Sequence, residues 1–466
     1  AGGVRCRSVH VLALDVGSSS VRARLYDERG RELEPASQRS YTPDYGHDGS
    51  VVHDAARLLE AMRGVLDETR AASSEVDSIA ISCLWHSLLV LDRDARPLTP
   101  VLLWQDRRSA RQAAELQLRL DSDEVHDRTG CVLHTSYWPA KLAWLADERR
   151  EVMAAADRFV SLADYLFLEL TGELRTTLSM ASGTGLLDLR ARAWDSELLD
   201  ALGLDEERLP PISDEPAGAP EQAFPPIGDG ACSNLGAGCV EPDRAALMIG
   251  TSGAYRVLRS TSDLDPRPGL FCYLLDDGHT VEGGAVSDGG GLYAWLQRTL
   301  KLDGPRFGEP DGHGLTFLPL LGGERSPGWN PGAKGAVAGL IYDTGPDDLL
   351  QAALEGVAYR FAEIAAFLPD VREIVATGHA LLVSPNWRTV AVRSTDEVLS
   401  LHDFETGCER ACLPGHQGPM LSWRFSPKGD RFVATESYPS NVMRLWDVPS
   451  GKLIATMRGH ENQVNH

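Results

Sequence analysis

One short pattern occurs twice in the chain: an apolar strand, a turn rich in glycine and hydroxyl side chains, and a second strand. The first copy is LALDVGSSSVRARLYD, residues 12–27, and the second is ALMIGTSGAYRVLRS, residues 246–260. Their turns lie 233 residues apart. Glycine lets such a turn close tightly, and its successive amide and hydroxyl groups can converge on one anion. The repetition predicts two related half-molecules that hold a polyphosphate between their turns.

The residues predicted to face that anion are Gly17, Ser18, Ser19, Ser20 and Arg22 in the first copy, and Gly250, Thr251, Ser252 and Gly253 in the second. Asp15 ends the first strand and is placed to hold a hydrated Mg²⁺. Met248 stands at that place in the second copy, so Asp15 has no counterpart there, and one carboxylate beside the metal would suffice. A single Gly-Ser turn is ordinarily no more than a turn, and the repetition favours the phosphate interpretation.

A second carboxylate, Asp229, lies between Gly228 and Gly230, just before a run of small residues that predicts a helix. Flanking glycines leave such a side chain approachable by a ligand hydroxyl. Accepting an alcohol proton is one of the few covalent tasks that phosphoryl transfer requires of a protein. The sequence therefore makes Asp229 a candidate general base, and an aspartate that caps the following helix is the alternative.

Charge and composition exclude several classes of protein. The formal net charge of the 466-residue chain is −22, and no Lys/Arg run interrupts it, which disfavours nucleic acid and anionic membrane partners. Apolar stretches are too short to span a bilayer, and the first residues do not resemble a signal peptide, so we expect a cytoplasmic protein. None of the 8 cysteines forms a C-x-x-C pair, which predicts reduced, mostly buried thiols.

Hydrophobic periodicity predicts an α/β architecture over the first 380 residues. Strands are expected at 9–15, 21–26, 78–82 and 88–92, and helices at 54–71 and 140–156. A late helix is expected to start at Asp347, because Leu350, Val357 and Ile364 lie on one apolar stripe. A Pro- and Gly-rich stretch at 210–230 separates two halves of this region.

The C-terminal segment has a different character. Residues 384–466 carry 9 basic and 9 acidic side chains, so the net charge lies in the preceding part. Gly415-His416 recurs as Gly459-His460, and Leu401-His402-Asp403 recurs as Leu445-Trp446-Asp447, both after 44 residues. Strand-like runs lie between these markers. The segment resembles WD40 repeats and implies an all-β partial propeller of two blades, plus the start of a third, over 383–466.

The first 380 residues resemble the FGGY family of carbohydrate kinases, in the actin-like ATPase superfamily, because six motifs occur in family order. They are Asp15–Ser20, Trp104–Arg108, Gly228-Asp229, Gly250–Gly253, Gly290-Gly291 before Trp295, and Leu321–Pro327. The resemblance implies two RNase H-like subdomains, 1–243 and 244–380, with ATP and sugar in the cleft. It also implies that Asp229 takes the proton of the attacking hydroxyl, and that the two turns and Gly290 lie at the nucleotide.

For the sugar, the resemblance indicates Trp85, His86, Asp106 and the glycines Gly228 and Gly230. An imidazole beside a carboxylate offers polyol hydroxyls both donors and acceptors. The Trp-His-Ser sequence at 85–87 is closer to gluconate kinases than to xylulose kinases. A structural role for His86 stays open, and for Trp104 and Trp138 core packing is favoured over stacking on a ligand.

The resemblance breaks at Ala376-Thr377-Gly378-His379-Ala380, where the family has Ala-Thr-Gly-Gly-Ala along the adenine nucleotide. Gly378 is predicted to contact the nucleotide, and the Cβ of His379 is expected to disturb that loop. Beyond this segment the family has further strands and helices that complete the second subdomain, whereas this chain becomes WD40-like. The second subdomain is therefore expected to be truncated, with low ATP affinity and exposed apolar surface.

Together these observations predict a cytoplasmic kinase that uses ATP and Mg²⁺ to phosphorylate a sugar or sugar acid of the gluconate or xylulose type. Two alternatives remain: a non-catalytic sugar-binding scaffold that recruits a protein partner through its blades, and a non-functional fusion.

Overall fold

The computed structural model describes residues 9–72, 76–218, 222–300, 302 and 307–377, and beyond them 381–383, 389–393, 399–403, 409–413, 420–426, 428–436 and 442–457. The chain divides into two compact units. The first comprises residues 1–242, 256–283 and 327–331, and the second comprises 243–255, 284–326 and 332–466.

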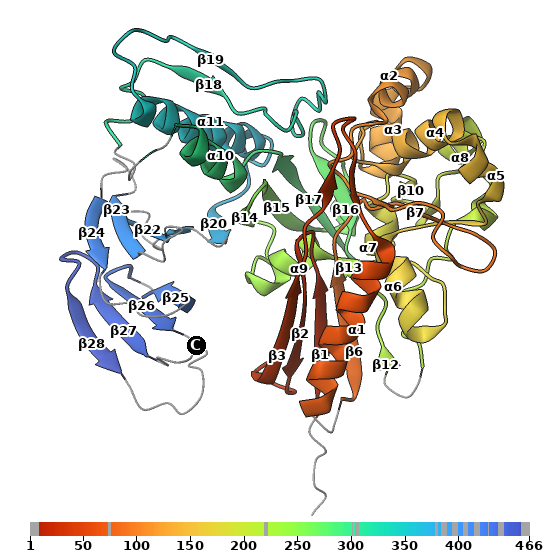
Figure 1. Ribbon diagram of the computed structural model, residues 1–466, viewed down its shortest axis with the longest axis horizontal. Helices are drawn as coiled ribbons and strands as arrows, with labels where there is room; N and C mark the ends of the chain where they lie inside the picture. The colour runs from red at the N-terminus through yellow and green to blue at the C-terminus, as the bar shows by residue number, and fades with distance from the viewer. Residues whose placement is uncertain are drawn as a thin grey trace, which may run out of the picture. The chain divides into compact units, whose positions relative to one another are not determined.

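The first unit is built on a mixed sheet of strand order β12-β6-β1-β2-β3, with β13 paired to β6. Its strands are β1 (Val11–Val16), β2 (Ser20–Tyr26), β3 (Glu32–Ser40), β6 (Ser78–Cys83), β12 (Gln222–Ala223) and β13 (Ile227–Gly228). Alternate β1 residues, Leu12, Leu14 and Val16, are buried, as a half-buried strand requires. Helix α1 (Ala55–Ala72) packs on β2 and β3 (Figure 1).

The register of this sheet collects chemistry at one edge. Strand β1 runs parallel to β6 with Asp15 beside Ser82, and β13 runs parallel to β6 with Gly228 beside Cys83. Because parallel strands end at the same edge, Asp15 and the residue after Gly228, Asp229, both lie there. Strand β2 returns antiparallel from the turn at Gly17–Ser20, so the first hairpin ends at this edge too.

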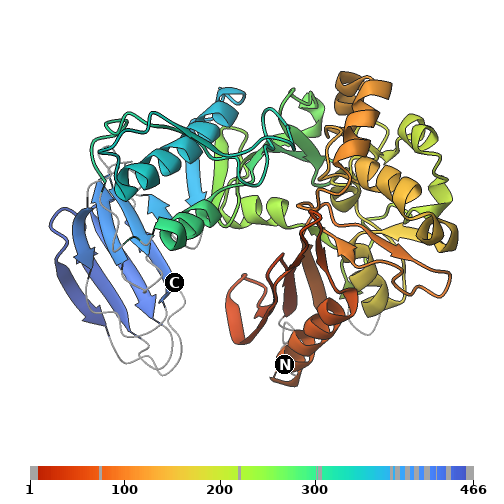
Figure 2. The same ribbon diagram turned by 45° about the horizontal axis from the view of Figure 1, so that its top comes forward.

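Further helices complete the first unit, and Figure 2 shows the orange and yellow ones gathered on one side of its sheet. These further helices are α2 (Ala110–Arg119), α3 (Ser122–Thr129), α4 (Trp138–Glu148), α5 (Arg150–Ala155), α6 (Leu162–Thr171), α7 (Leu178–Ser182), α8 (Ser196–Leu202) and α9 (Asp229–Gly236). The short strands are β4 (Asp44–Tyr45), β5 (Val51–His53), β7 (Leu89–Leu91), β8 (Val101–Leu102), β9 (Arg158–Val160), β10 (Leu187–Asp188) and β11 (Ala193–Trp194). The prediction of one helix over 140–156 is wrong, because Arg149 leaves helical geometry at φ −133° and separates α4 from α5.

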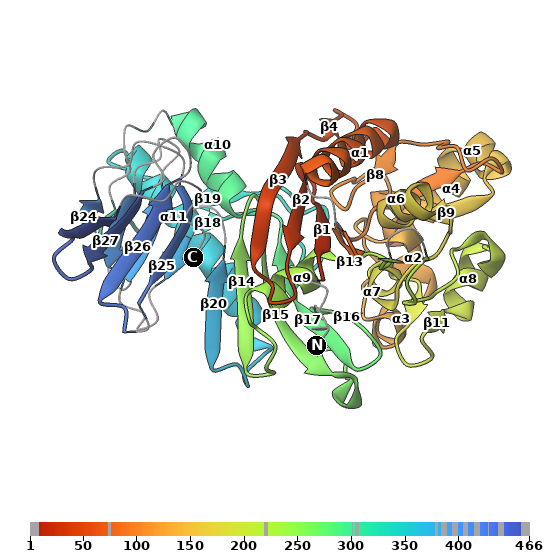
Figure 3. The same cartoon turned by 90° about the horizontal axis from the view of Figure 1, so that it is seen from below.

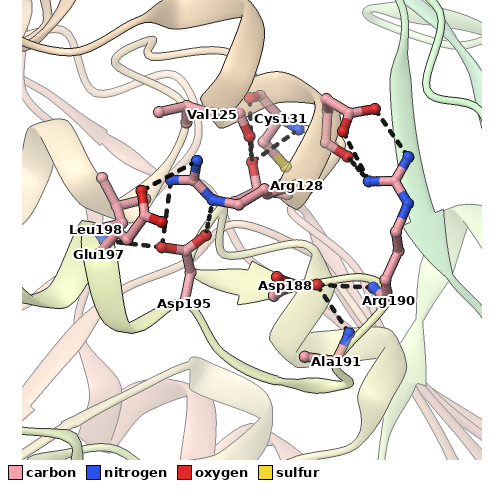
Figure 4. Close-up of polar contacts among 11 residues, drawn as sticks. Val125, Arg128, Cys131, Asp188, Arg190, Ala191, Asp195, Glu197 and Leu198 are labelled. Atoms are coloured by element: carbon pink, nitrogen blue, oxygen red, sulfur yellow. Dashed lines mark hydrogen bonds and ion pairs between the residues drawn. The ribbon is translucent and has the colours of Figure 1, made fainter.

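Ion pairs hold α3 against α8 and the segment after β10 (Figure 4). Arg128 Nε donates to Asp195 Oδ2 at 2.6 Å, and Asp195 also caps α8 by accepting from Leu198 N at 2.8 Å. Arg190 donates to both carboxylate oxygens of Asp127 at 2.8 Å. The Asp195 side chain is 2% exposed, whereas that of Asp127 is 56% exposed. Removing the partner of the buried Asp195 should therefore destabilise the fold more than removing the partner of Asp127.

A second mixed sheet has the order β16-β17-β15-β14-β20. The elements of this part are β14 (Arg244–Ile249), β15 (Gly253–Ser260), β16 (Phe271–Leu274), β17 (His279–Val286), α10 (Gly290–Leu300), β18 (Thr316–Leu318), β19 (Ala336–Ala338), α11 (Pro346–Ala366) and β20 (Glu373–Thr377). The predicted late helix is confirmed as α11. Pro346 is its first residue, and Asp348 accepts from Gly345 N at 2.8 Å, which fixes the start of the helix.

The C-terminal segment forms two antiparallel four-stranded sheets, and Figure 3 shows strands of the second side by side. They contain β21 (Leu381–Val383), β22 (Thr389–Arg393), β23 (Leu399–Asp403) and β24 (Glu409–Leu413), and β25 (Met420–Phe425), β26 (Arg431–Glu436), β27 (Met443–Asp447) and β28 (Leu453–Met457). Phe432 and Trp446 are fully buried in their shared core. The described strands form no closed propeller, and both Gly-His markers lie outside the described residues. The WD40 assignment stays a prediction.

Across the parts of the chain that the structure describes, no helix combines the length and the hydrophobicity needed to cross a membrane.

Candidate active site

The first predicted phosphate turn is a tight connection between β1 and β2. Gly17 N donates to Ser20 O at 2.9 Å and closes the turn. Ser18 and Ser19 at its tip are exposed, while Ser20 is buried as the first residue of β2. The turn therefore presents two hydroxyl-bearing residues to solvent at the edge of the first sheet.

Asp15 lies directly below this turn and is held by two neighbours. Its Oδ1 accepts from Ser82 Oγ at 3.1 Å, and its Oδ2 lies 3.6 Å from Arg22 Nη1. The side chain is 45% exposed. A carboxylate that is oriented from both sides and still reaches solvent fits a hydrated divalent cation.

Asp229 is the first residue of α9, directly after β13. The N-cap of α9 is Gly228, and no side chain caps the helix, so the capping alternative for Asp229 is wrong. The residue is half-buried. Its carboxylate lies at the same edge as Asp15.

The surroundings of Asp229 raise the pKa of its carboxyl group. Burial raises the pKa of Asp229 to about 6, the Arg256 guanidinium opposes that rise, and the negative charge of Asp15 adds to it. Backbone groups of Gly230 and Trp85 also favour the ionised form. A carboxylate with a pKa close to physiological pH suits a general base better than an ordinary aspartate.

Two glycines make room for the side chains around this carboxylate. A Cβ at Gly228 would lie 1.8 Å from Trp85 Cε2. A Cβ at Gly230 would lie 2.6 Å from Trp85 Cζ3 and 2.9 Å from Arg256 Cζ. The glycines on either side of Asp229 are therefore required by the packing of Trp85 and Arg256.

Sequence reasoning missed Arg256, although a signal was present. Arg256 is a buried cation in β15, between apolar neighbours such as Tyr255 and Val257. Burying a cation is costly unless a negative group compensates it. An arginine in an otherwise apolar strand thus indicates a nearby acid.

Trp85 and His86 belong to a buried aromatic cluster. Trp85 Nε1 donates to Ser179 O at 3.0 Å, and His86 Nδ1 donates to Gly183 O at 2.5 Å. Both rings pack against Tyr273. The ring centroid of Trp85 lies 4.9 Å from that of Tyr273, and the centroid of His86 lies 5.4 Å from it. His86 makes the contact expected of a structural histidine, and its role towards substrate stays a prediction.

The backbone of His86 is held by the buried side chain of Lys141. Lys141 Nζ donates to His86 O and Ser136 O, both at 2.8 Å. Burial lowers the pKa of Lys141 to about 7, while the charge of Asp106 opposes that change. His86 adopts a φ of 65°, which is strained for a side chain of this size, so these hydrogen bonds help to maintain the conformation.

Asp106 is engaged by its own neighbours. Arg108 Nη2 donates to Asp106 Oδ2 at 2.6 Å, Arg108 Nε donates to Oδ1 at 3.0 Å, and Val51 N donates to Oδ2 at 3.3 Å. The residue is 3% exposed, and its substrate role stays a prediction. Trp138 is fully buried and donates to Ser87 O at 2.9 Å, which confirms the core-packing interpretation.

The second predicted turn is a comparable hairpin, closed by Gly250 N donating to Ser252 O at 2.8 Å. The first amides of α10 bond to it. Gly290 N donates to Gly250 O at 2.7 Å, and Gly291 N donates to Thr251 O at 3.0 Å. Gly253 packs against α11, where a Cβ would lie 2.4 Å from Phe361 Cζ. Gly378 and His379 lie outside the described residues.

In the described part of the chain, Asp311, His313 and Glu355 bring possible metal-ligand atoms within 4.8 Å of one another. His313 Nδ1 accepts from Leu315 N at 3.0 Å, so His313 Nε2 carries the proton and donates to Glu355 Oε2 at 3.1 Å. Glu355 also accepts from Asp311 N at 3.1 Å. These hydrogen bonds join the His313 ring and the Glu355 carboxylate to each other and to backbone amides.

Comparisons with known proteins decide the family. Residues 10–219 match the N-terminal domain, and residues 245–388 the C-terminal domain, of the FGGY family of carbohydrate kinases. Gluconokinase of Bacillus subtilis (strain 168) is 30% identical over 456 residues, with 87% of each chain covered. The chain belongs to the FGGY family. It is an ATP-dependent carbohydrate kinase, a phosphotransferase, and its kinase part has the mixed α/β actin-like ATPase fold.

Other relatives agree with this assignment. Xylulose kinase of Escherichia coli (strain K12) is 28% identical over 379 residues, covering 76% of this chain and 77% of that protein. The crystal structure of gluconate kinase from Lactobacillus acidophilus superposes with a TM-score of 0.72 at 27% identity, covering 80% of this chain and 81% of that one. The C-terminal family match extends to residue 388, past the predicted break near 380, so truncation stays a prediction without support from these comparisons.

Proposed function

We propose that this FGGY kinase transfers the γ-phosphoryl group of ATP to a hydroxyl of a sugar acid of the gluconate type. The observation that carries the proposal is the placement of Asp229. Its carboxylate has a pKa of about 6, and the residue directly follows β13 at the sheet edge where the Gly17–Ser20 turn and Asp15 also lie. A base and a phosphate turn at one edge are what the reaction needs.

In the proposed reaction, Asp229 accepts the proton of the attacking hydroxyl. The new bond joins that oxygen to the γ-phosphorus, while the bond from the γ-phosphorus to the bridging oxygen breaks and ADP leaves. Arg256 keeps Asp229 ionised before the transfer, because its positive charge opposes the effect of burial. Positioning and charge compensation supply most of the acceleration in such transfers.

The residues of the first hairpin are proposed to hold the phosphates. The exposed Ser18 and Ser19 and the side chain of Arg22 offer donors at the turn, and Asp15 is proposed to hold Mg²⁺ through water. When bound, the cation neutralises charge on the phosphate oxygens. Motif order supports further nucleotide contacts at Gly250–Gly253, Gly290 and Gly378.

The substrate class is proposed from the relatives and from the residues beside the base. Two of the similar proteins are a gluconokinase and a gluconate kinase by name, and a third is a xylulose kinase. Trp85 and His86, together with Gly228 and Gly230, are the groups proposed to lie beside the sugar. The packing of Trp85 beside Gly228 and Gly230 would bring one hydroxyl of the substrate to the base.

The experiment is a substrate panel assayed by ADP release, with the product identified by mass spectrometry. Gluconate is expected to give the highest kcat/KM, above xylulose and glycerol, and a product that carries one added phosphoryl group. A higher kcat/KM for xylulose than for gluconate would contradict the proposed substrate and identify xylulose as the preferred one. Sugar binding by calorimetry without ADP release on any substrate would overturn the proposal and favour the non-catalytic scaffold.

A further inference from the structure

The carbonyl oxygens of the first phosphate turn all accept hydrogen bonds from within the first unit. Tyr41 OH donates to Gly17 O at 2.7 Å, and His53 Nε2 donates to Ser18 O at 2.9 Å. Tyr41 N donates to Ser19 O at 2.9 Å, and Gly17 N donates to Ser20 O at 2.9 Å. Two of these four bonds come from side chains, one from just beyond β3 and one from the end of β5.

These bonds decide which side of the turn faces a ligand. In a trans peptide the carbonyl oxygen and the next amide hydrogen point in opposite directions. With the oxygens of Gly17 and Ser18 bonded to Tyr41 and His53, the amides of Ser18 and Ser19 point the other way. Amides attract an anion, and carbonyl oxygens carry a partial negative charge that repels it. The two side chains therefore set the polarity of the turn.

Both side chains are suited to this task because they stay neutral. His53 is 3% exposed, and burial lowers its pKa, so the ring is uncharged at neutral pH. Since Ser18 O can only accept, the proton of the ring is on Nε2. Burial raises the pKa of Tyr41, so its hydroxyl keeps its proton. The two rings meet edge to face with centroids 5.1 Å apart, which fixes one against the other.

The second turn obtains the same polarity by other means. There, amides of Gly289, Gly290 and Gly291 donate to the oxygens of Gly250 and Thr251. A Cβ at Gly290 would lie 2.9 Å from Gly250 O, so glycine is needed for this approach. In the first turn, side chains make the corresponding hydrogen bonds. The orientation of that turn can therefore be tested by substituting those side chains conservatively.

We propose that Tyr41 and His53 are positioning residues that turn the amides of Ser18 and Ser19 towards the nucleotide phosphates. The inference rests on the proposed function, since it assumes that the first turn binds ATP. It predicts that removing either donor weakens binding of the polyphosphate, without changing the affinity for the sugar or for the nucleoside part of ATP.

The test uses the full chain with the variants Tyr41→Phe, His53→Leu and His53→Gln. Thr69→Val is the matched control, because Thr69 is fully buried and its hydroxyl donates within α1, to Val65 O at 2.8 Å. The affinity for the ATP analogue AMP-PNP with Mg²⁺ is measured by calorimetry, and adenosine by competition. KM values for ATP and gluconate follow from kinetics, and the melting temperature reports on folding.

Tyr41→Phe and His53→Leu are each expected to weaken AMP-PNP binding and to raise KM for ATP by about five- to tenfold, the effect of one hydrogen bond. The adenosine affinity and KM for gluconate should not change. His53→Gln keeps an N–H donor and should stay within about twofold of the wild type, as should Thr69→Val.

Two results would overturn the inference. One is unchanged AMP-PNP affinity in both donor-deleting variants when their melting temperatures match that of Thr69→Val. The other is an equal loss for AMP-PNP, adenosine and gluconate, which indicates general damage to the fold. A wild-type chain that binds gluconate but not AMP-PNP would instead overturn the proposed function, and the nucleotide role of both residues with it.

Discussion

The substitution Gly228→Ala tests how the base is held, because the new methyl group would collide with Trp85. It would lie 1.8 Å from Trp85 Cε2 and 2.2 Å from Cζ2 and Nε1. Carbon atoms in ordinary contact lie about 3.5–4.0 Å apart, so the indole has to move by about 2 Å. That movement breaks the hydrogen bond from Trp85 Nε1 to Ser179 O, now 3.0 Å long.

The expected cost is the sum of two effects. Losing the hydrogen bond costs about 1 kcal/mol, and overpacking costs about 1–3 kcal/mol, so the free energy of unfolding should fall by about 2–4 kcal/mol. Because Asp229 is the next residue, kcat should fall as well. Urea unfolding measures the loss of stability, and ADP release at saturating substrates measures the loss of kcat.

Gly236→Ala is the matched control, since Gly236 lies in α9 and a Cβ there meets nothing within 4 Å. It should leave stability unchanged or raise it by up to about 1 kcal/mol. In a Trp85→Leu background, Gly228→Ala should cost much less, because the collision is removed. The reasoning is refuted if Gly228→Ala costs no more than the control, or if its cost is the same in both backgrounds.

Further predictions concern charge. The value of kcat/KM should rise with pH through about 6, because Asp229 loses its proton there, and near pH 5 it should lie about tenfold below its plateau. A value of kcat/KM that stays constant between about pH 5 and 7 would exclude Asp229 as the base. Arg256→Gln should move this acid limb to higher pH and Arg256→Lys should move it less, because the guanidinium opposes protonation of Asp229; an unmoved limb in Arg256→Gln would count against that role. Arg128→Met leaves the buried Asp195 without its partner and should lower the free energy of unfolding, measured in urea, by about 3–5 kcal/mol. Arg190→Gln breaks an exposed pair and should lower it by less than about 1 kcal/mol. Equal losses of stability in the two variants would contradict the argument from burial.

Much of the local structure could be predicted from the sequence, because it depends on neighbouring residues. The hairpin at 12–27 is predicted by strand alternation and a glycine turn, and α11 by Pro346 and an apolar stripe. Asp229 could be chosen because a glycine-flanked carboxylate is a local signal. The break at Arg149 could not, since periodicity continues through it.

The surroundings of the site depend on contacts between distant parts of the chain. Arg256 approaches Gly230 from another sheet, and Trp85 fills the space above Gly228. Tyr41 and His53 reach the first turn from elements with no motif of their own. No spacing rule brings these residues together, because strand order and register decide it.

The most direct test of the account is the rate of gluconate phosphorylation by Asp229→Asn, measured together with gluconate affinity by calorimetry. The amide cannot accept the hydroxyl proton as the carboxylate does, so the rate should fall by about 10²–10⁴-fold, while the dissociation constant of gluconate stays within about twofold. Phosphorylation at the wild-type rate by Asp229→Asn would contradict the central claim.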